Sequence, residues 1–200
     1  MITLLFVFGI SLSSAAERIV IIGDSHAYGY MGKNLQKSLK KQGHDVELFA
    51  VSGSSAKNWL GQQGSMPTFS EIIETKKPQK IIFSLGTNDV FNQCPNEEFF
   101  SDNVKKILSI IPKSTTCVWV GPPGYQKGKI ISKCKSFYNG LVDGLQKTVS
   151  VRCKFIDTRK NVEMLENPKY VEKDTIHMTS VGGEFWNQFI LSQMDDELAK

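Results

Sequence analysis

Residues 18–26 read RIVIIGDSH, and this stretch decides the fold. Arg18 to Ile22 is a short, mostly β-branched run, which predicts a buried strand. Gly23 ends the run, and Asp24 and Ser25 place polar groups where the strand stops. An almost wholly apolar strand is typical of a parallel sheet that is covered on both faces.

Strand-like and helix-like segments alternate along the rest of the chain. Further strands are predicted at residues 46–51, 80–85, 117–120 and 151–156, and helices at 28–43, 100–111, 130–145 and 181–189. This alternation predicts an α/β three-layer sandwich, in which a five-stranded parallel sheet carries helices on both faces. Ligands bind at the carboxyl ends of such strands, so the polar segments that follow the strands should meet at one edge.

The bulk properties describe one ordinary globular domain. The chain has 200 residues, of which 40% are hydrophobic, and its net charge is only +4. Nucleic-acid binding is not indicated, because it usually needs a concentrated basic stripe. Lys33, Lys37, Lys40 and Lys41 do cluster at helical spacing. We interpret them as the solvated face of one helix, and contact with an anionic polymer or a membrane surface is the alternative.

The first sixteen residues differ from the rest. Residues 2–10 are almost wholly apolar, and small residues follow up to Ala16. This pattern predicts a signal peptide at 1–16, one folded domain at 17–200, and export to the periplasm or the extracellular space. The stretch is too short for stable membrane insertion. The alternative is a buried first strand.

Four cysteines lie in the remaining chain: Cys94, Cys117, Cys134 and Cys153. An even number in an exported chain is compatible with two disulfides. Cys117 and Cys153 each lie four residues before the turn that ends their strand, so neighbouring strands would bring them side by side. We therefore expect the pairs Cys117–Cys153 and Cys94–Cys134, with four reduced, buried cysteines as the alternative. No C-x-x-C element supports a metal or redox site.

Ser25 is the first candidate for chemistry, because a serine just past a buried strand presents its hydroxyl at the sheet edge. Its alternative role is the N-cap of the next helix. A serine nucleophile needs a histidine base and an orienting partner. His177 follows Asp174 by three residues, a spacing that lets the carboxylate reach Nδ1 and leaves Nε2 for the nucleophile. A surface loop with a chance D-x-x-H is the alternative for Asp174 and His177. His26 is a less suitable base, because the side chains of adjacent residues usually diverge and His26 directly follows Ser25.

Two further strand ends offer donors for a developing negative charge. Gly53 follows the second strand, and the absence of a side chain there permits close backbone approach. Asn88 lies in Gly-Thr-Asn-Asp after the third strand and offers a side-chain amide. A turn glycine and an Asx-turn are the respective structural alternatives.

Together the four segments Gly23-Asp24-Ser25, Gly53, Gly86-Thr87-Asn88-Asp89 and Asp174-x-x-His177 resemble, in order and setting, the SGNH or GDSL hydrolases, a family of serine esterases and lipases. The resemblance implies a flavodoxin-like fold, with Ser25 as nucleophile, His177 as base and Asp174 as its partner. It also implies an oxyanion hole formed by the backbone N–H groups of Ser25 and Gly53 and the side chain of Asn88. No metal or cofactor is implied. His26 departs from the family motif, which has Leu there.

The substrate expected from the resemblance is a small acyl ester, most simply an acetyl ester on a polysaccharide or peptidoglycan. Trp59 either stacks on a sugar ring or packs in the core, and Asp24 and His26 are further candidate substrate-binding residues. A lysophospholipase or thioesterase of the same family is the first alternative. A sugar O-acetyltransferase and a non-catalytic carbohydrate-binding relic are the others.

Overall fold

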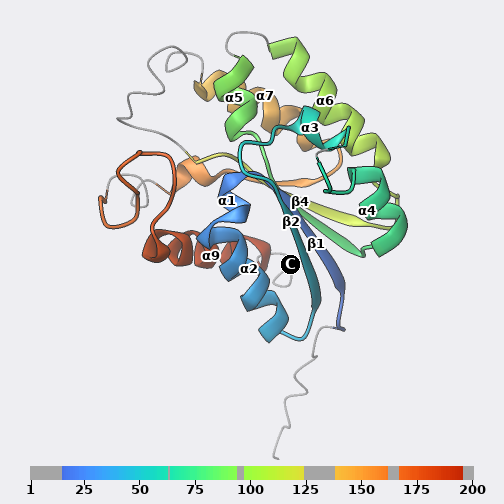
Figure 1. Ribbon diagram of the computed structural model, residues 1–200, viewed down its shortest axis with the longest axis horizontal. Coiled ribbons are helices and arrows are strands. Elements are labelled where there is room, and N and C mark those ends of the chain that lie inside the picture. Colours follow the sequence, from blue (N-terminus) through green and yellow to red (C-terminus); the bar gives the residue numbers. More distant parts are fainter. Residues whose placement is uncertain (1–14, 63, 94–96, 124–137, 162–166, 196–200) are drawn as a thin grey trace, which may run out of the picture.

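Five parallel strands run through the part of the chain that the computed structural model describes, residues 15–62, 64–93, 97–123, 138–161 and 167–195 (Figure 1). They are β1 (Arg18–Gly23), β2 (Asp45–Ala50), β3 (Lys80–Ser84), β4 (Thr116–Val120) and β5 (Lys154–Ile156). Their order is β2-β1-β3-β4-β5, and every neighbouring pair is parallel. The order changes direction at β1, and ligands bind at such a switch point in open α/β sheets.

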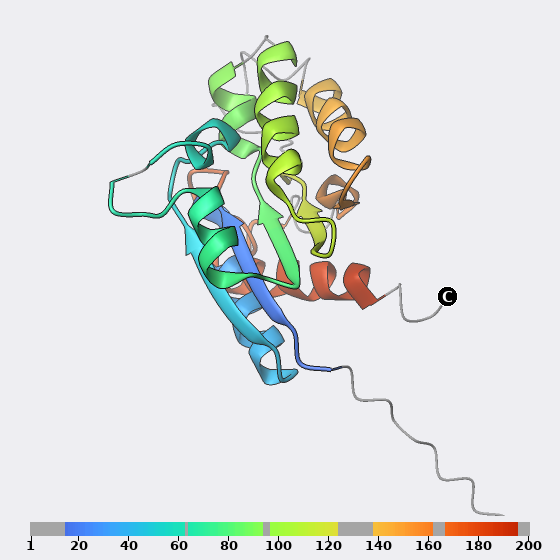
Figure 2. The ribbon, with the colours of Figure 1, turned by 90° about the vertical axis from the view of Figure 1, so that its right-hand side faces the viewer.

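Helices cover both faces of the sheet (Figure 2). The helices are α1 (Ser25–Tyr28), α2 (Tyr30–Lys41), α3 (Ala56–Trp59), α4 (Phe69–Lys76), α5 (Thr87–Gln93), α6 (Glu97–Ile110), α7 (Tyr138–Val149) and α9 (Ser180–Asp195), with a short 3-10 turn, η2 (Thr158–Lys160). Helices α2 and α9 pack on one face, and α3, α4, α6 and α7 contribute to the core on the other. The predicted three-layer α/β sandwich is confirmed.

The alternation of side chains along β1 explains why its sequence is apolar throughout. Ile19 and Ile21 face the layer of α2 and α9, whereas Val20 and Ile22 face the opposite core. All four side chains are at most 2% exposed. Burial of each contributes roughly 1.5–3 kcal/mol relative to exposure. In the described part of the chain, no helix is long and apolar enough to cross a membrane.

Several element boundaries differ from the prediction. The fifth strand begins at Lys154 rather than at residue 151, because residues 151–153 form the turn that closes α7; the N–H of Cys153 donates to the Val149 carbonyl at 2.9 Å. The helix predicted at 28–43 is two helices, and they meet at Gly29, whose N–H closes α1 on the Ser25 carbonyl. Helices α3 and α4 were not predicted. Residues 130–137 of the predicted fourth helix lie outside the described residues.

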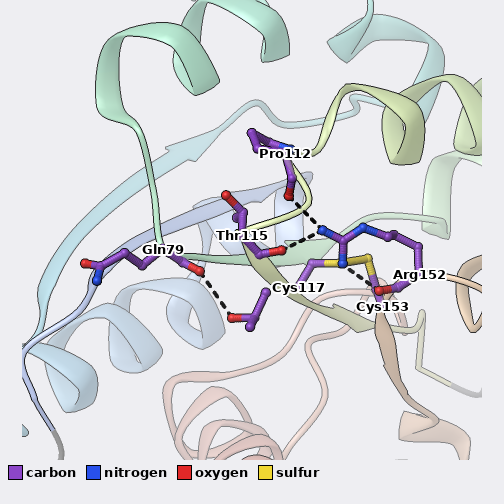
Figure 3. The surroundings of a disulfide bond; sticks show 7 residues. Gln79, Pro112, Thr115, Cys117, Arg152 and Cys153 are labelled. Carbon is purple, nitrogen blue, oxygen red and sulfur yellow. Dashed lines mark hydrogen bonds between the residues drawn. A yellow bond between two sulfur atoms is a disulfide. The ribbon is translucent and has the colours of Figure 1, made fainter.

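A disulfide joins Cys117 to Cys153, as predicted, and links β4 to the residue before β5 (Figure 3). The strand register explains the pairing, because Val118 lies opposite Lys154 and the two cysteines each come one residue earlier. Arg152 reinforces this edge by donating hydrogen bonds to the carbonyls of Pro112 and Thr115, at 2.8 and 2.7 Å. Cys94 and Cys134 lie outside the described residues, so their pairing stays a prediction.

We predict that the double variant Cys117→Ala/Cys153→Ala unfolds with a free energy about 2–4 kcal/mol lower than that of the wild type, because the cross-link restricts the unfolded chain across 36 residues. Urea denaturation followed by tryptophan fluorescence would measure the difference. The same comparison in dithiothreitol is the control, and there the two proteins should nearly coincide. A gap of equal size under reducing conditions would attribute the loss to packing and contradict the prediction.

Candidate active site

The end of β1 is held between the ends of its two neighbours. The N–H of Asp24 donates to the Ser84 carbonyl of β3 at 3.1 Å, and the Gly23 carbonyl accepts the N–H of Val51, after β2, at 3.0 Å. A Cβ on Gly23 would lie 2.4 Å from the Cβ of Ala27 and 2.7 Å from the Ser84 oxygen. Only glycine therefore allows α1 to begin this close to the sheet.

Ser25 is the first residue of α1, and Asp24 is the N-cap. The Asp24 side chain accepts the N–H of His26 at 2.9 Å. The alternative in which Ser25 serves as the N-cap is therefore wrong. Ser25 is half-buried, and its side chain lines a small cavity at the carboxyl edge of the sheet.

Asp174 and His177 form a hydrogen-bonded pair on the loop before α9. Nδ1 of His177 lies 2.6 Å from Oδ2 of Asp174, and Oδ1 of Asp174 accepts the backbone N–H groups of Ile176 and His177 at 2.9 Å each. Burial raises the pKa of Asp174, but the hydrogen bonds from His177 and Ile176 outweigh it and lower this pKa to about 2. The carboxylate is therefore ionised at neutral pH and orients the imidazole.

His177 lines the same small cavity as Ser25, although 152 positions separate them in the sequence. The loop that carries His177 is fixed by two backbone hydrogen bonds: Glu172 donates to the His177 carbonyl at 2.8 Å, and Thr179 donates to the Tyr170 carbonyl at 2.9 Å. The cavity is also lined by residues that the sequence analysis did not single out: Gly29, Tyr30, Met31 and Met178. Tyr30 and Met31 lie in the helix predicted at 28–43, and the sequence gave no signal for Met178.

Gly53 and Asn88 lie on two loops that are tied together. Gly53 lies in the turn after β2 with a φ of 77°. The side-chain amide of Asn88, near the start of α5, donates to the Ser54 carbonyl at 3.0 Å. The Ser54 hydroxyl in turn donates to the Gly23 carbonyl at 3.3 Å. The three strand ends that were expected to meet are thus connected through Ser54, whose role the sequence gave no sign of.

The Trp59 side chain packs in the core, so the interpretation in which it stacks on a sugar ring is wrong. It is 1% exposed, and its indole N–H donates to the Ser54 hydroxyl at 3.1 Å. A tryptophan buried this way holds the loop after β2 in place. Of the two roles considered for Trp59, the structure shows core packing, on an α3 turn only four residues long.

Asp24 is also buried rather than open to a substrate, so its assignment as a substrate-binding residue is wrong. It is 1% exposed, and its Oδ2 has no hydrogen-bond partner among the described residues. Burial, aided by the nearby carboxylate of Asp89, raises the pKa of Asp24 to about 7 despite the hydrogen bond from His26. Asp89 accepts the Ala56 N–H with both oxygens, at 2.9 and 3.1 Å, and burial likewise raises its pKa to about 7.

His26 lines the same cavity as Ser25. Its ring is 4% exposed and lies between two others, with centroid distances of 5.1 Å to Trp186 and 5.7 Å to His177. Burial and the proximity of His177 lower the pKa of His26 to about 3, although Asp174 opposes this. His26 is therefore neutral beside the candidate base, and its contact with substrate stays a prediction.

These features define a class of protein: a doubly wound parallel sheet with a serine and a histidine–aspartate pair at its carboxyl edge is the architecture of the flavodoxin-like ester hydrolases. The sequence profile of the GDSL-like lipase/acylhydrolase family matches residues 21–184, and the chain belongs to this family. The predicted family and the prediction of an enzyme that cleaves carboxylic esters are confirmed.

Individual relatives agree with this assignment. The chain is 26% identical over 141 residues to an arylesterase from Vibrio mimicus, which covers 64% of this chain and 67% of the relative. A lipase/acylhydrolase from Enterococcus faecalis matches with a TM-score of 0.68 at 18% identity, covering 90% of this chain and 96% of that one. An acetylxylan esterase from Geobacillus stearothermophilus matches with a TM-score of 0.65 at 13% identity, covering 90% and 95%. The two structural likenesses concern the fold.

We predict that the free energy of unfolding of Asp24→Asn, relative to that of the wild type, increases as the pH rises from 5 to 8. Asp24 ionises near 3.8 in the unfolded chain and near 7 in the folded one, so the folded wild type loses stability as the pH rises through this window. Asparagine keeps the oxygen that accepts the His26 N–H and does not ionise. The relative gain should be roughly 1–4 kcal/mol, measured by urea denaturation at both pH values.

Asp157→Asn is the matched control. The pKa of Asp157 is lowered, because hydrogen bonds and charge from Arg159 outweigh burial, so Asp157 is ionised in both states at pH 5 and at pH 8. Its loss of stability should be equal at the two pH values. If Asp24→Asn showed the same pH-independent behaviour, Asp24 would be ionised throughout and the interpretation would fail.

Proposed function

We propose that this protein is an exported serine esterase that hydrolyses small acyl esters, acetyl esters first, on a polysaccharide or peptidoglycan. Ser25, His177 and Asp174 form its catalytic triad. The observation that carries the proposal is the 2.6 Å contact between His177 and Asp174 on the cavity that Ser25 also lines. A base held by an ionised carboxylate beside a strand-end serine is the arrangement that acyl transfer needs.

In the proposed reaction, the Ser25 hydroxyl attacks the ester carbonyl and His177 takes its proton at Nε2. The ionised Asp174 holds the Nδ1–H and stabilises the imidazolium that forms. His177 then gives the proton to the departing alcohol, which leaves an acyl group on Ser25. Water, activated by the same histidine, releases the acid and restores the serine.

The oxyanion of each tetrahedral intermediate would accept hydrogen bonds from the backbone N–H groups of Ser25 and Gly53 and from the Asn88 amide. The connection of Asn88 to the Ser54 carbonyl supports this assignment, because it keeps the amide next to the loop of Gly53. The amide nitrogen carries two hydrogens, and the bond to Ser54 occupies one of them. Donors of this kind are worth roughly 3–4 kcal/mol each.

The preference for a short acyl group rests on the size and lining of the cavity. The residues that line it beside Ser25 include His26, Met31 and Met178. The names of two relatives, an arylesterase and an acetylxylan esterase, agree with small esters. Export is supported by the apolar segment within residues 1–16 and by the disulfide, since disulfides persist in oxidising compartments.

We predict that Ser25→Ala, His177→Ala and Asp174→Asn each lower kcat for p-nitrophenyl acetate, the first two by roughly 10⁴- to 10⁶-fold and the third by roughly 10³- to 10⁴-fold. Each change removes one member of a unit that acts together. Ser109→Ala on α6 is the control, since its exposed hydroxyl only bonds to its own helix at the Lys106 carbonyl. Full activity of Ser25→Ala would refute the triad.

We also predict that kcat/KM falls by about tenfold or more from p-nitrophenyl acetate to p-nitrophenyl octanoate, because the cavity that Ser25 lines is small. The common leaving group makes acyl length the only variable. Activity that rises with chain length would favour a lysophospholipase or thioesterase instead. Product analysis with a sugar acceptor would detect the O-acetyltransferase alternative.

A further inference from the structure

Two exposed tyrosines stand beside the cavity that Ser25 and His177 line. The side chains of Tyr28 and Tyr30 are 57% and 50% exposed, and they are two of only four large hydrophobic side chains exposed in the described part of the chain. Tyr28 follows Ser25 by one turn of α1, which places both on one side of the helix. Tyr30 lines the cavity itself. Aromatic rings left in solvent next to a catalytic cavity indicate a surface that binds a ligand.

The position of Tyr30 relative to the candidate base is fixed by close packing. A Cβ on Gly183 of α9 would lie 2.5 Å from the Cβ of Tyr30 and 3.0 Å from the N of Met31. Helix α9 begins three residues after His177, and it packs along α2. The backbone of Tyr30 is thereby held against the element that carries the base, so a ligand stacked on this ring would be in a defined place relative to Ser25.

Positive charge continues from the tyrosines along α2. Nζ of Lys33 lies 5.1 Å from the centroid of the Tyr28 ring, and Lys37 follows one turn later. Helix α2 contains no acidic residue, and neither lysine forms an ion pair with any residue that the structure describes. Cationic side chains that form no ion pair raise the local concentration of anionic ligands beside a catalytic site. We name Tyr28, Tyr30, Lys33 and Lys37 the Tyr–Lys strip.

We propose that the Tyr–Lys strip binds an anionic polysaccharide of the uronic-acid type and presents its acetyl esters to Ser25. This inference rests on the proposed esterase function and names its substrate class. The tyrosine rings contact the C–H faces of sugar rings, while the two lysines pair with carboxylates on the same chain. The strip also supplies the aromatic surface that the buried Trp59 does not offer. An anionic membrane would need a larger apolar surface than two tyrosines provide.

The test compares kcat/KM for three acetyl esters: acetylated polygalacturonate, the neutral acetylated glucomannan and p-nitrophenyl acetate. For each polysaccharide, the ratio of its kcat/KM to that of p-nitrophenyl acetate is compared. The double variant Lys33→Gln/Lys37→Gln should lower this ratio about tenfold for acetylated polygalacturonate and much less for acetylated glucomannan. Tyr28→Ala should lower both polysaccharide ratios, by about threefold to tenfold. The effect of the lysines should fade as the ionic strength rises from about 0.01 M to about 1 M, since the Debye length falls from about 30 to about 3 Å.

Lys147→Gln is the matched control, because Lys147 is an exposed lysine on α7, a helix that packs on the opposite face of the sheet. It should change none of the ratios. Ratios in the strip variants that equal those of Lys147→Gln would overturn the inference. Stronger binding to vesicles of phosphatidylglycerol and phosphatidylcholine than to polygalacturonate would also overturn it, in favour of a membrane surface.

A binding experiment separates this inference from the proposed function. Affinity electrophoresis of the Ser25→Ala protein in deacetylated polygalacturonate measures the strip without any catalysis. Retardation that disappears in the lysine double variant supports the strip, even if the Ser25→Ala activity test had refuted the triad. Esterase activity that depends on Ser25, together with no retardation, would leave the triad intact and refute the strip.

Discussion

The contact that the rest of the site depends on is the approach of α1 to the end of β1 at Gly23. No Cβ fits there, because Ala27 and the Ser84 carbonyl already occupy the space. The absence of a side chain lets α1 start directly over the switch point of the sheet, and the hydrogen bond from Asp24 to Ser84 fixes the turn on β3. The proposed roles of Ser25, Gly53 and Asn88 in one site require these three strand ends to be this close.

The candidate base, His177, comes to this site through tertiary packing rather than at the end of a strand. His177 lies on a loop whose two ends are joined by the bridge between Val171 and Met178, and α9 then packs along α2. Trp186 of α9 is 1% exposed and touches His26 edge-on. Helices α2 and α9, which follow Ser25 and His177 in the chain, therefore share one core, so loosening α9 would separate His177 from Ser25 without any change at the strand ends.

The parts of this protein that could be predicted from sequence are those with local signals. Apolar runs located the strands, and the residues after each strand located Ser25, Gly53 and Asn88. The 3-residue spacing of Asp174 and His177 predicted their contact, because a single turn determines it. The disulfide was predictable as well, since it follows from the register of two neighbouring strands.

The errors concern contacts between segments far apart in the chain. Trp59 lies in a polar, glycine-containing stretch, and only the core formed by α6 and the sheet explains its burial. The burial of the His26 ring involves Trp186, 160 positions later, which contacts it edge-on. The raised pKa of Asp24 likewise involves the carboxylate of Asp89, 65 positions later, in addition to burial. Periodicity within a segment carries no information about such partners.

The disulfide lies at the amino ends of β4 and β5, whereas Ser25 lies at the carboxyl end of β1. The cross-link and the chemistry are thus at opposite ends of the sheet. Proteases cleave segments that open locally, and β5 is a strand at the edge of the sheet. Because the bond ties β5 to β4 at a place remote from Ser25, resistance to proteolysis at this edge can change without a change beside the serine.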